Sequence, residues 1–345
     1  MTSNTYDESN TSGILFDGAE GLRNKTVMVT GATGLIGRTL IGYLMMLNRQ
    51  HQFATRVVAV ARDRQKAEAL LGKENDMLTI HCHDFSQPSE LALEQKVDYI
   101  IHLASPTASR FFLEHPAATL LTTLHGTEAV LNYARHRQVE GMVYVSSLEA
   151  YGQVTDDSQP LTEDIQGYVN PIDSRSSYPT AKRAAEALCH AYAAEHGVRV
   201  CIARLAQTFG EGVAADDQRV FAQFARSAVN NTDIVLHTKG ELCRCYCHTT
   251  DAAEALLLLA MRGAAGEAYN VAHPDSYISI IDMARMVCRE FAPDTKVVVV
   301  PKEGMGYSPT TKLRLDTTKM EALGWKPLTP LREMFRLLIE SFRKA

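Results

Sequence analysis

The sequence predicts an α/β fold in which a doubly wound parallel sheet is followed by a smaller α+β lobe. Three observations support this prediction. An apolar run at 26–30 leads into Gly31, Gly34 and Gly37, and a helical pattern follows to about Asn48. Strand-like and helix-like stretches then alternate to about residue 205, and beyond it the alternation breaks. Alternating strands and helices form a parallel sheet that is covered on both faces, so the first part is expected to be a Rossmann domain.

Short apolar runs and helical spacing mark the elements of this domain in order. After the first strand, strands are expected at 55–60, 78–80, 97–103, 142–145 and 198–203, with helices at 63–72, 117–137 and 180–196. The domain is expected to span about 25–205. Residues 1–24 precede it as a flexible extension, because the first dozen residues are rich in Ser, Thr and Asn.

The second part, 206–345, is expected to form mainly a lobe that binds the substrate. Its predicted helices lie at 217–229, 250–262, 279–291 and 330–343, and its short strands lie near 234–237, 268–271 and 296–300. Glycines and prolines separate them, as at 302–309.

Composition excludes several classes of function. The chain has 345 residues, 46% hydrophobic, with a net charge of -5. That charge gives no basic footprint for nucleic acid. No apolar run approaches the ~20 residues that a membrane helix needs. The first residues carry Asp7 and Glu8 and lack a basic-then-apolar signal, so a cytoplasmic protein is expected.

Seven cysteines are scattered along the chain, which suits reduced thiols. Cys243, Cys245, Cys247 and His248 form the one notable cluster. A zinc site would need C-x-x-C-like spacing, which is missing. Small apolar packing is therefore the expected role, and no metal site is predicted.

The three glycines predict a dinucleotide site. Gly31 allows the turn, Gly34 lets the backbone approach a pyrophosphate, and Gly37 lets the helix pack closely on the strand. The start of the helix offers free N–H groups to the phosphates. The neighbouring residues expected to contact the same cofactor are Thr33, Leu35, Ile36 and Arg38.

Tyr178 and Lys182 form a Tyr-x-x-x-Lys pair, one helical turn apart on one helix face. The ammonium is expected to lower the phenol pKa from ~10 toward neutrality, so that Tyr178 can exchange a proton with a substrate hydroxyl. Lys182 would also reach the nicotinamide ribose. Ser147, at the end of the fifth strand, can share the substrate oxygen or simply cap the turn.

These features resemble the extended short-chain dehydrogenase/reductases that act on nucleotide sugars, the epimerase/dehydratase/decarboxylase family, over roughly residues 25–343. Five further segments carry the resemblance: H-L-A-S-P at 102–106, as in UDP-glucuronate decarboxylases, G-T at 126–127, R-L-A-Q-T-F-G at 204–210, G-E-L-C-R-C-Y-C-H-T-T-D at 240–251 and L-G-W-K-P at 323–327. Two positions depart from the family pattern, since Thr123 and Gln207 stand where asparagines are usual.

The resemblance also implies roles for individual residues. Cofactor contacts are expected from Leu103, Ala104 and Ser105, and adenine contacts from Asp84 and Phe85. Arg244 would clasp the nucleotide diphosphate, for which a guanidinium is suited. Further candidates for the substrate pocket are Gln207, Arg219 and Arg314, although both arginines could equally be ordinary solvated side chains. Family members commonly pair through the two long helices, here 113–137 and 179–196, so a homodimer is expected.

The cofactor choice depends on the end of the second strand. NAD-preferring members carry an acidic residue there, which binds the ribose 2′-hydroxyl. Here Ala61 holds that position and Arg62 follows it, with Arg38 expected nearby. Two cations favour NADP, although a slip of one residue would place Asp63 at the acidic position and restore NAD.

The segment after the fifth strand separates the reactions of the family. Where 4,6-dehydratases carry Thr-Asp-Glu, this chain reads Ser147-Leu148-Glu149. Leucine cannot protonate a departing hydroxyl, so no 4,6-dehydratase activity is expected. Decarboxylation of a nucleotide hexuronate ranks first, with Glu149 as the catalytic carboxylate, and C4 or C5 epimerisation follows. The alternative role of Glu149 is to cap the loop. The alternative functions are an NADPH-dependent reductase of a nucleotide 4-keto-sugar and a non-catalytic dinucleotide-binding regulator.

Overall fold

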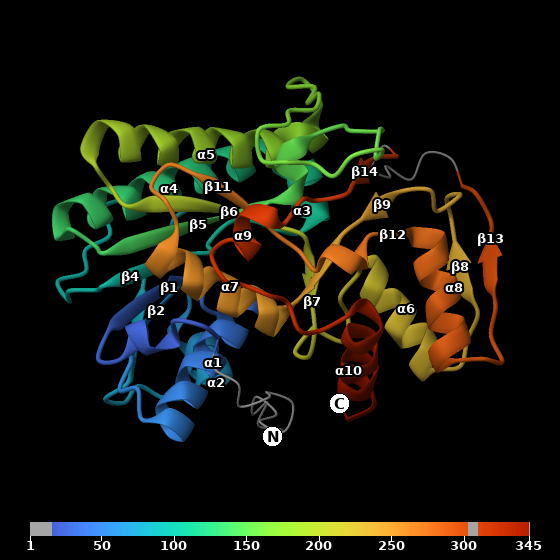
Figure 1. The fold of residues 1–345 in the computed structure, drawn as a ribbon, viewed down its shortest axis with the longest axis horizontal. Helices are drawn as coiled ribbons and strands as arrows, with labels where there is room; N and C mark the ends of the chain where they lie inside the picture. Colours follow the sequence, from blue (N-terminus) through green and yellow to red (C-terminus); the bar gives the residue numbers. More distant parts are fainter. Residues whose placement is uncertain (1–15, 303–309, 345) are drawn as a thin grey trace.

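The computed structural model describes residues 16–302 and 310–344 (Figure 1). A large sheet with its helices forms one side of the molecule, and a smaller lobe that holds α6, α8 and α10 forms the other (Figure 1). The predicted α/β class is confirmed.

The large sheet has seven parallel strands in the order β11-β6-β5-β4-β1-β2-β3. Their bounds are β1 (Thr26–Thr30), β2 (Arg56–Ala61), β3 (Leu78–Cys82), β4 (Tyr99–His102), β5 (Gly141–Ser147), β6 (Val200–Leu205) and β11 (Ala268–Val271). The chain builds outward from β1 in one direction through β2 and β3, and in the other through β4 to β6. Ligands of such sheets bind at the carboxyl ends of the strands where the order reverses, here between β1 and β4.

Helices cover both faces of this sheet. One core contains buried residues of α1 (Leu35–His51), α2 (Arg64–Leu71) and α7 (Thr249–Arg262). The other contains buried residues of α4 (Pro116–Arg137) and α5 (Ser177–His196). Two short helices, α3 (Ser109–Glu114) and α9 (Thr318–Glu321), complete this part.

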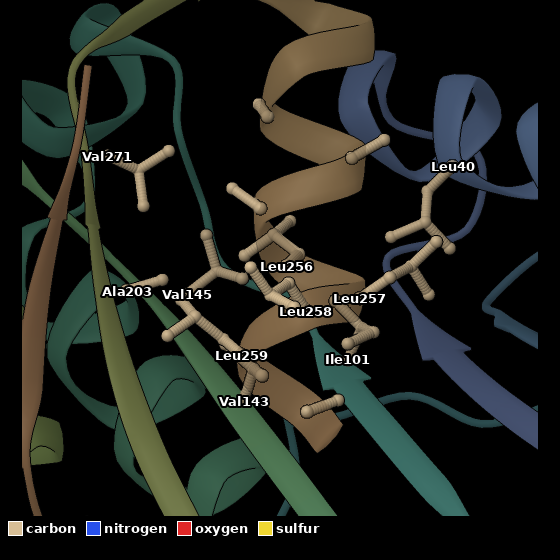
Figure 2. Packing of buried hydrophobic residues seen from close by; sticks show 14 of the residues in the cluster. Leu40, Ile101, Val143, Val145, Ala203, Leu256, Leu257, Leu258, Leu259 and Val271 are labelled. Carbon is tan, nitrogen blue, oxygen red and sulfur yellow. The ribbon is translucent and has the colours of Figure 1, made fainter. Parts of the chain in front are cut away.

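Helix α7 lies deep in the first core. Figure 2 shows Leu256, Leu257, Leu258 and Leu259 among side chains of the sheet and Leu40 of α1. All four leucines are at most 1% exposed, as expected of a helix that is apolar on every side. Helix α7 and strand β11 fall within the range 206–345 that was predicted to be mainly the lobe, but they return to the large sheet. The chain therefore passes between the sheet domain and the lobe more than once, and a single boundary at 205 does not separate them.

The lobe has a core of its own, in which the Phe209 ring stacks on Phe221 at 4.5 Å and meets Phe335 edge-on. It contains α6 (Val220–Val229), α8 (Ile280–Phe291), α10 (Leu331–Lys344) and the parallel pair β8 (Ile234–Leu236) and β13 (Val297–Val299). Two small sheets connect it to the rest. One pairs β7 (Gln207–Phe209) with β10 (Tyr246–His248), and the other places β9 (Cys243–Arg244) between β12 (Ile278–Ser279) and β14 (Lys312–Leu313).

The predicted flexible extension needs a correction. Residues 1–15 lie outside the described residues, but residues 16–24 are attached to the core, because Ala19 and Leu22 are 2% and 0% exposed. None of the helices in the described ranges is both long and apolar enough to cross a membrane.

Candidate active site

The glycine turn after β1 is a close-packed cradle. Gly31 has a φ of 66°, and a Cβ there would lie 2.9 Å from the backbone nitrogen of Ala104. A Cβ on Gly37 would lie 2.6 Å from the carbonyl oxygen of Gly31. Neither position can hold a side chain without moving the backbone. Thr33 lies in this turn, Gly34 is the N-cap of α1, and Leu35 is its first residue, so the helix N-terminus faces the carboxyl edge of the sheet as predicted.

Thr30 joins the ends of β1 and β4 beneath this turn. Its Oγ1 accepts hydrogen bonds from the backbone nitrogens of Leu103, at 3.2 Å, and Ala104, at 3.1 Å. The Thr30 hydroxyl can then donate its own proton to Nδ1 of His102, at 2.7 Å. Burial, together with the charge of Lys182, lowers the pKa of His102 to about 3, so the ring is neutral. The motifs alone do not reveal this role of Thr30.

Ser105 retains a partner despite the departure from the family pattern. Its hydroxyl lies 3.1 Å from that of Thr123 on α4, the position where the family has asparagine. A shorter side chain thus still holds the loop after β4.

At the end of β2, Asp63 caps α2 by accepting a hydrogen bond of 3.0 Å from the Lys66 nitrogen. One oxygen of the Asp63 carboxylate is thus engaged with the start of α2. Arg62 is exposed, and Asp84 lies close enough for the Arg62 charge to help lower its pKa, after the larger effect of the Ser86 backbone.

Arg38 and Phe85, two predicted cofactor residues, also contact other parts of the protein. Arg38 donates a hydrogen bond of 2.8 Å to the carbonyl oxygen of Gly212, so it contacts the lobe. The Phe85 ring is buried in the second core and packs against the His83 ring. Ile36 packs against the first core.

The structure brings together the four predicted catalytic residues. Ser147 ends β5, and its Oγ accepts a hydrogen bond of 3.2 Å from the Glu149 nitrogen. Tyr178 is the second residue of α5, and Lys182 lies one turn later, with its Nζ 5.6 Å from the Tyr178 ring centroid. The Lys182 ammonium donates a hydrogen bond of 2.8 Å to the carbonyl oxygen of Val145.

The expected fall in the Tyr178 pKa is not found. Burial is the largest effect and raises that pKa, the charge of Glu149 raises it further, and contact with the Ser147 hydroxyl lowers it. Burial also lowers the pKa of Lys182 to about 8, against the opposing charge of Glu186. Tyr178 is therefore protonated, and Lys182 remains mostly charged at neutral pH.

Phe112 and Glu186 support this cluster and were not predicted. The Phe112 ring, on α3, stacks on the Tyr178 ring with centroids 4.3 Å apart and planes 9° apart. Glu186 accepts a hydrogen bond from the Ser146 hydroxyl and forms a buried ion pair of 2.7 Å with Arg204. Glu186 lies one helical turn after Lys182, and this spacing could have indicated that the two side chains share a helix face. No motif marked Phe112.

A pocket opens beside the catalytic cluster. Its charged lining residues are Glu149, Asp173, Arg175 and Arg244. Leu148, by contrast, is only 1% exposed and belongs to the first core. The sequence order Leu148-Glu149 thus places the hydrocarbon side chain in the core and the carboxylate at the pocket.

Arg244 is the best supported of the predicted substrate residues. It is 8% exposed, and its Nη1 donates to both the carbonyl oxygen and the Oγ1 of Thr311. Burial lowers its pKa, and the charge of Glu149 opposes that effect.

The other predicted substrate residues are not among the described residues that line this pocket. Gln207 begins β7, where its backbone nitrogen donates to the carbonyl oxygen of Cys245. Arg219 forms an ion pair of 2.6 Å with Asp217, and the Arg314 side chain is exposed. Ordinary surface or local structural roles account for their positions here.

The predicted packing role of the cysteines is confirmed for Cys245 and Cys247, which are both 0% exposed and belong to the first core. Within residues 16–302 and 310–344, no three His, Cys, Asp or Glu side chains are grouped as a metal site would require.

Comparisons with known proteins agree with this geometry. The model of the NAD dependent epimerase/dehydratase family matches residues 27–272. UDP-glucuronic acid decarboxylase 6 of Arabidopsis thaliana is 30% identical over 320 residues, which cover 93% of this chain and 89% of that protein. UDP-glucuronic acid decarboxylase 1 of Xenopus tropicalis is 30% identical over 93% of this chain and 72% of its own length.

Among solved structures, an epimerase from Methanothermobacter thermautotrophicus has the same fold, with a TM-score of 0.78 at 22% identity over 94% of each chain. The family model covers well over half of this chain, and its match contains the glycine cradle and the Tyr178–Lys182 pair. The protein therefore belongs to the NAD dependent epimerase/dehydratase family.

Proposed function

We propose that this protein decarboxylates a nucleotide hexuronate, with UDP-glucuronate as the first candidate, through transient oxidation at C4. One observation carries the proposal. Glu149 lines the pocket beside Tyr178, whereas the neighbouring position that would hold the acid of a 4,6-dehydratase is Leu148, buried in the core. The site has a carboxylate for chemistry at C5 and lacks the adjacent acid at C6. The names of the two decarboxylase relatives point to the same reaction.

The residues at the sheet edge fit a nicotinamide dinucleotide. Gly31 and Gly37 leave no room for a side chain, and the start of α1 offers its N–H groups to a pyrophosphate. NADP is the proposed form, because Ala61 ends β2, Arg62 follows it, and Asp63 is engaged as the cap of α2. When bound, the oxidised nicotinamide supplies a hydride acceptor and a positive charge that favours the phenolate of Tyr178.

In the first half-reaction, Tyr178 acts as the phenolate, having first lost its own proton to solvent, and takes the proton of the C4 hydroxyl while C4 loses its hydride. The Ser147 hydroxyl holds the same oxygen. The Lys182 ammonium, held by the Val145 carbonyl and charged at neutral pH, stabilises the phenolate. The product of this step is a 4-keto hexuronate, in which the carboxylate is β to a carbonyl.

In the second half-reaction, the C5–C6 bond breaks and carbon dioxide leaves. The electron pair moves to the C4 oxygen, where hydrogen bonds from Tyr178 and Ser147 stabilise the enolate. A proton taken up from solvent is then added at C5, and we assign its relay to Glu149. C4 regains its hydride, Tyr178 returns its proton, and a nucleotide pentose is released.

The proposal is tested by incubating the enzyme and NAD(P) with UDP-glucuronate, UDP-glucose and dTDP-glucose, and measuring product masses. A loss of 44 mass units from UDP-glucuronate is expected, without the loss of 18 that marks a dehydratase. Tyr178→Phe should lower turnover ~10²–10⁴-fold while leaving cofactor binding nearly intact.

Other outcomes identify the alternatives. An unchanged mass with altered stereochemistry indicates epimerisation, and a gain of 2 with net use of NADPH indicates a reductase. A 4-keto-6-deoxy product from dTDP-glucose, at a rate comparable with any other substrate, would refute the assignment of Leu148.

A further inference from the structure

The pocket beside Tyr178 contains an arginine that the functional argument so far leaves without a role. We propose that Arg175 is a specificity-determining residue that binds the hexuronate carboxylate and thereby distinguishes a nucleotide hexuronate from a neutral nucleotide hexose. The inference rests on the proposed function, since it names the group that selects the substrate class. It follows from the place of Arg175 in the chain, the charges of the pocket and the needs of the substrate.

The chain places Arg175 close to the reacting carbons. It lies in a short 3-10 turn, Ser174–Ser176, which leads directly into α5, and Ser177 is already helical. Arg175 and Tyr178 are therefore three residues apart along a continuous helical path, and such pairs have Cβ atoms about 5–6 Å apart on one face. The carboxylate carbon is bonded to C5, the neighbour of C4. A side chain that binds it must lie this close to the residue that acts at C4.

The same turn is held firmly. Asp173 caps it by accepting a hydrogen bond of 2.9 Å from the Arg175 nitrogen. The Ser176 nitrogen donates to the Asp173 carbonyl oxygen, also at 2.9 Å. The Asp173 carboxylate, which also lines the pocket, is thus engaged with the backbone of the turn. The backbone of Arg175 is fixed before any ligand binds, which favours recognition by a preset group.

The charged groups that line the pocket are two carboxylates and two guanidiniums. Arg175 and Arg244 line it together with Glu149, which is assigned to the chemistry at C5, and Asp173, which caps the turn. Burial is the largest effect on the Arg244 pKa and lowers it, the charge of Glu149 raises it, and the charge of Arg175 is a smaller effect that lowers it, so the two guanidiniums lie close enough to repel each other. A carboxylate bound beside Arg175 would relieve this repulsion.

The substrate has two anionic groups, and the pocket has two guanidiniums. Arg244 is assigned to the diphosphate, which is carried on C1, whereas the carboxylate is carried on C5. Arg175 is assigned to the carboxylate because it lies next to Tyr178 in the chain. A planar guanidinium matches a carboxylate through two parallel hydrogen bonds, so it can also fix the direction of the C5–C6 bond. A neutral hydroxymethyl group at C6 offers no charge to Arg175.

The test measures equilibrium binding, so that it does not depend on turnover. The enzyme, saturated with NADPH, is titrated with UDP-glucuronate and with UDP-glucose, which differ only at C6. The wild type should bind UDP-glucuronate more tightly. Arg175→Gln should weaken UDP-glucuronate by about 10- to 150-fold, as expected for hydrogen bonds to a charged group, while UDP-glucose changes by no more than about twofold.

Two further variants separate recognition from structure. Arg175→Lys keeps the charge but loses the two-point contact, so it should recover part of the preference for UDP-glucuronate. Arg285→Gln, at an exposed position on α8, should change neither constant.

The failures of the two proposals are distinguishable. If the wild type prefers UDP-glucuronate and releases carbon dioxide from it, but Arg175→Gln keeps the full preference, the role of Arg175 is wrong and the proposed function stands. Equal weakening of both ligands also overturns the inference, because it would show a general structural defect. If the wild type shows no preference for UDP-glucuronate, carboxylate recognition by Arg175 is wrong, and the mass assay then decides the reaction independently.

Discussion

Replacing Lys182 with methionine tests whether the active site holds its cation at the expense of stability. Lys182 is 3% exposed, and burial lowers its pKa from 10.5 to about 8. Methionine has a similar length and fits an apolar surrounding without a charge. It also removes the hydrogen bond to the Val145 carbonyl. The variant should therefore lose the cation that stabilises the Tyr178 phenolate while escaping the cost of burying that cation.

The magnitude follows from the pKa. A fall from 10.5 to about 8 corresponds to about 3 kcal/mol of cost to the folded state at neutral pH, at ~1.4 kcal/mol per pH unit. Loss of a partner for the Val145 carbonyl offsets about 1–3 kcal/mol of this gain. The net expectation is a cofactor-free variant about 0–2 kcal/mol more stable than the wild type at pH 7, with turnover reduced ~10²–10⁴-fold.

The pH dependence gives a sharper result than the value at one pH. Because the folded-state pKa is lowered, the folded protein releases the proton of Lys182 above about pH 8, while the unfolded chain retains it to about pH 10.5. The unfolded state then binds more protons, so this group makes the wild type more stable as the pH rises through that window. Between pH 7 and pH 9.5 the advantage of the methionine variant should shrink by about 2 kcal/mol.

The assay is urea denaturation of cofactor-free wild type and variant at pH 7 and pH 9.5, with Lys73→Met, at an exposed position, as the control. The control should show no comparable change with pH. A difference between wild type and Lys182→Met that stays constant across this range would show that Lys182 is not charged and desolvated in the folded protein. Near-normal turnover of the variant would refute its catalytic role.

Two further predictions concern the cofactor and the assembly. Arg62→Ala should weaken NADP by about 10- to 150-fold and NAD far less, because only NADP has a 2′-phosphate for the guanidinium to bind. Equal losses for both cofactors in a titration would contradict the NADP preference. We also propose a homodimer through α4 and α5, where Leu121 is 50% exposed. Light scattering at micromolar concentration should give twice the mass of one chain, and Leu121→Glu should shift it toward the monomer. A monomeric wild type would rule out this interface.

Much of the fold was predictable because its signals are local. The helices α4, α5 and α8 are long enough for several turns of apolar spacing, and the observed bounds lie close to the predicted ones. Strands β9, β12 and β14 have two residues each and show no periodicity that a sequence could reveal. The return of α7 and β11 to the large sheet was also not predictable. Local apolar patterns at 250–262 and near 268–271 indicate a helix and a strand, but they do not indicate which sheet the two elements pack against or join.

The site was predictable where the chemistry requires a fixed spacing. Tyr178 and Lys182 must lie one turn apart, and Gly31 and Gly37 must allow backbone contacts, so the sequence alone identifies them. Phe112 was not predictable, because its stacking on Tyr178 depends on where the loop after β4 returns. The Tyr178 pKa was mispredicted for a related reason, since burial exceeds the effect of a nearby ammonium and the sequence does not show burial.

The two halves of the pocket come from distant parts of the chain, and hydrogen bonds between them fix their separation. Glu149 precedes a loop at 153–161, and Arg244 lies on β9, which pairs with β14. The loop is bonded to the β14 segment at both ends: the Lys312 nitrogen donates to the Val154 carbonyl at 2.8 Å, and the Leu161 nitrogen donates to the Arg314 carbonyl at 2.6 Å.

Between these bonds, Asp157 forms an ion pair of 2.9 Å with Lys312 and accepts a hydrogen bond of 2.8 Å from Tyr277. The half-buried ion pair contributes little by itself, but the two backbone bonds hold the loop in one register against β14. Glu149 and Arg244 are therefore connected through a continuous hydrogen-bonded path. The spacing of the carboxylate and the guanidinium is set by the fold, so a nucleotide sugar meets preset charges, and its selection depends on which anionic groups match them.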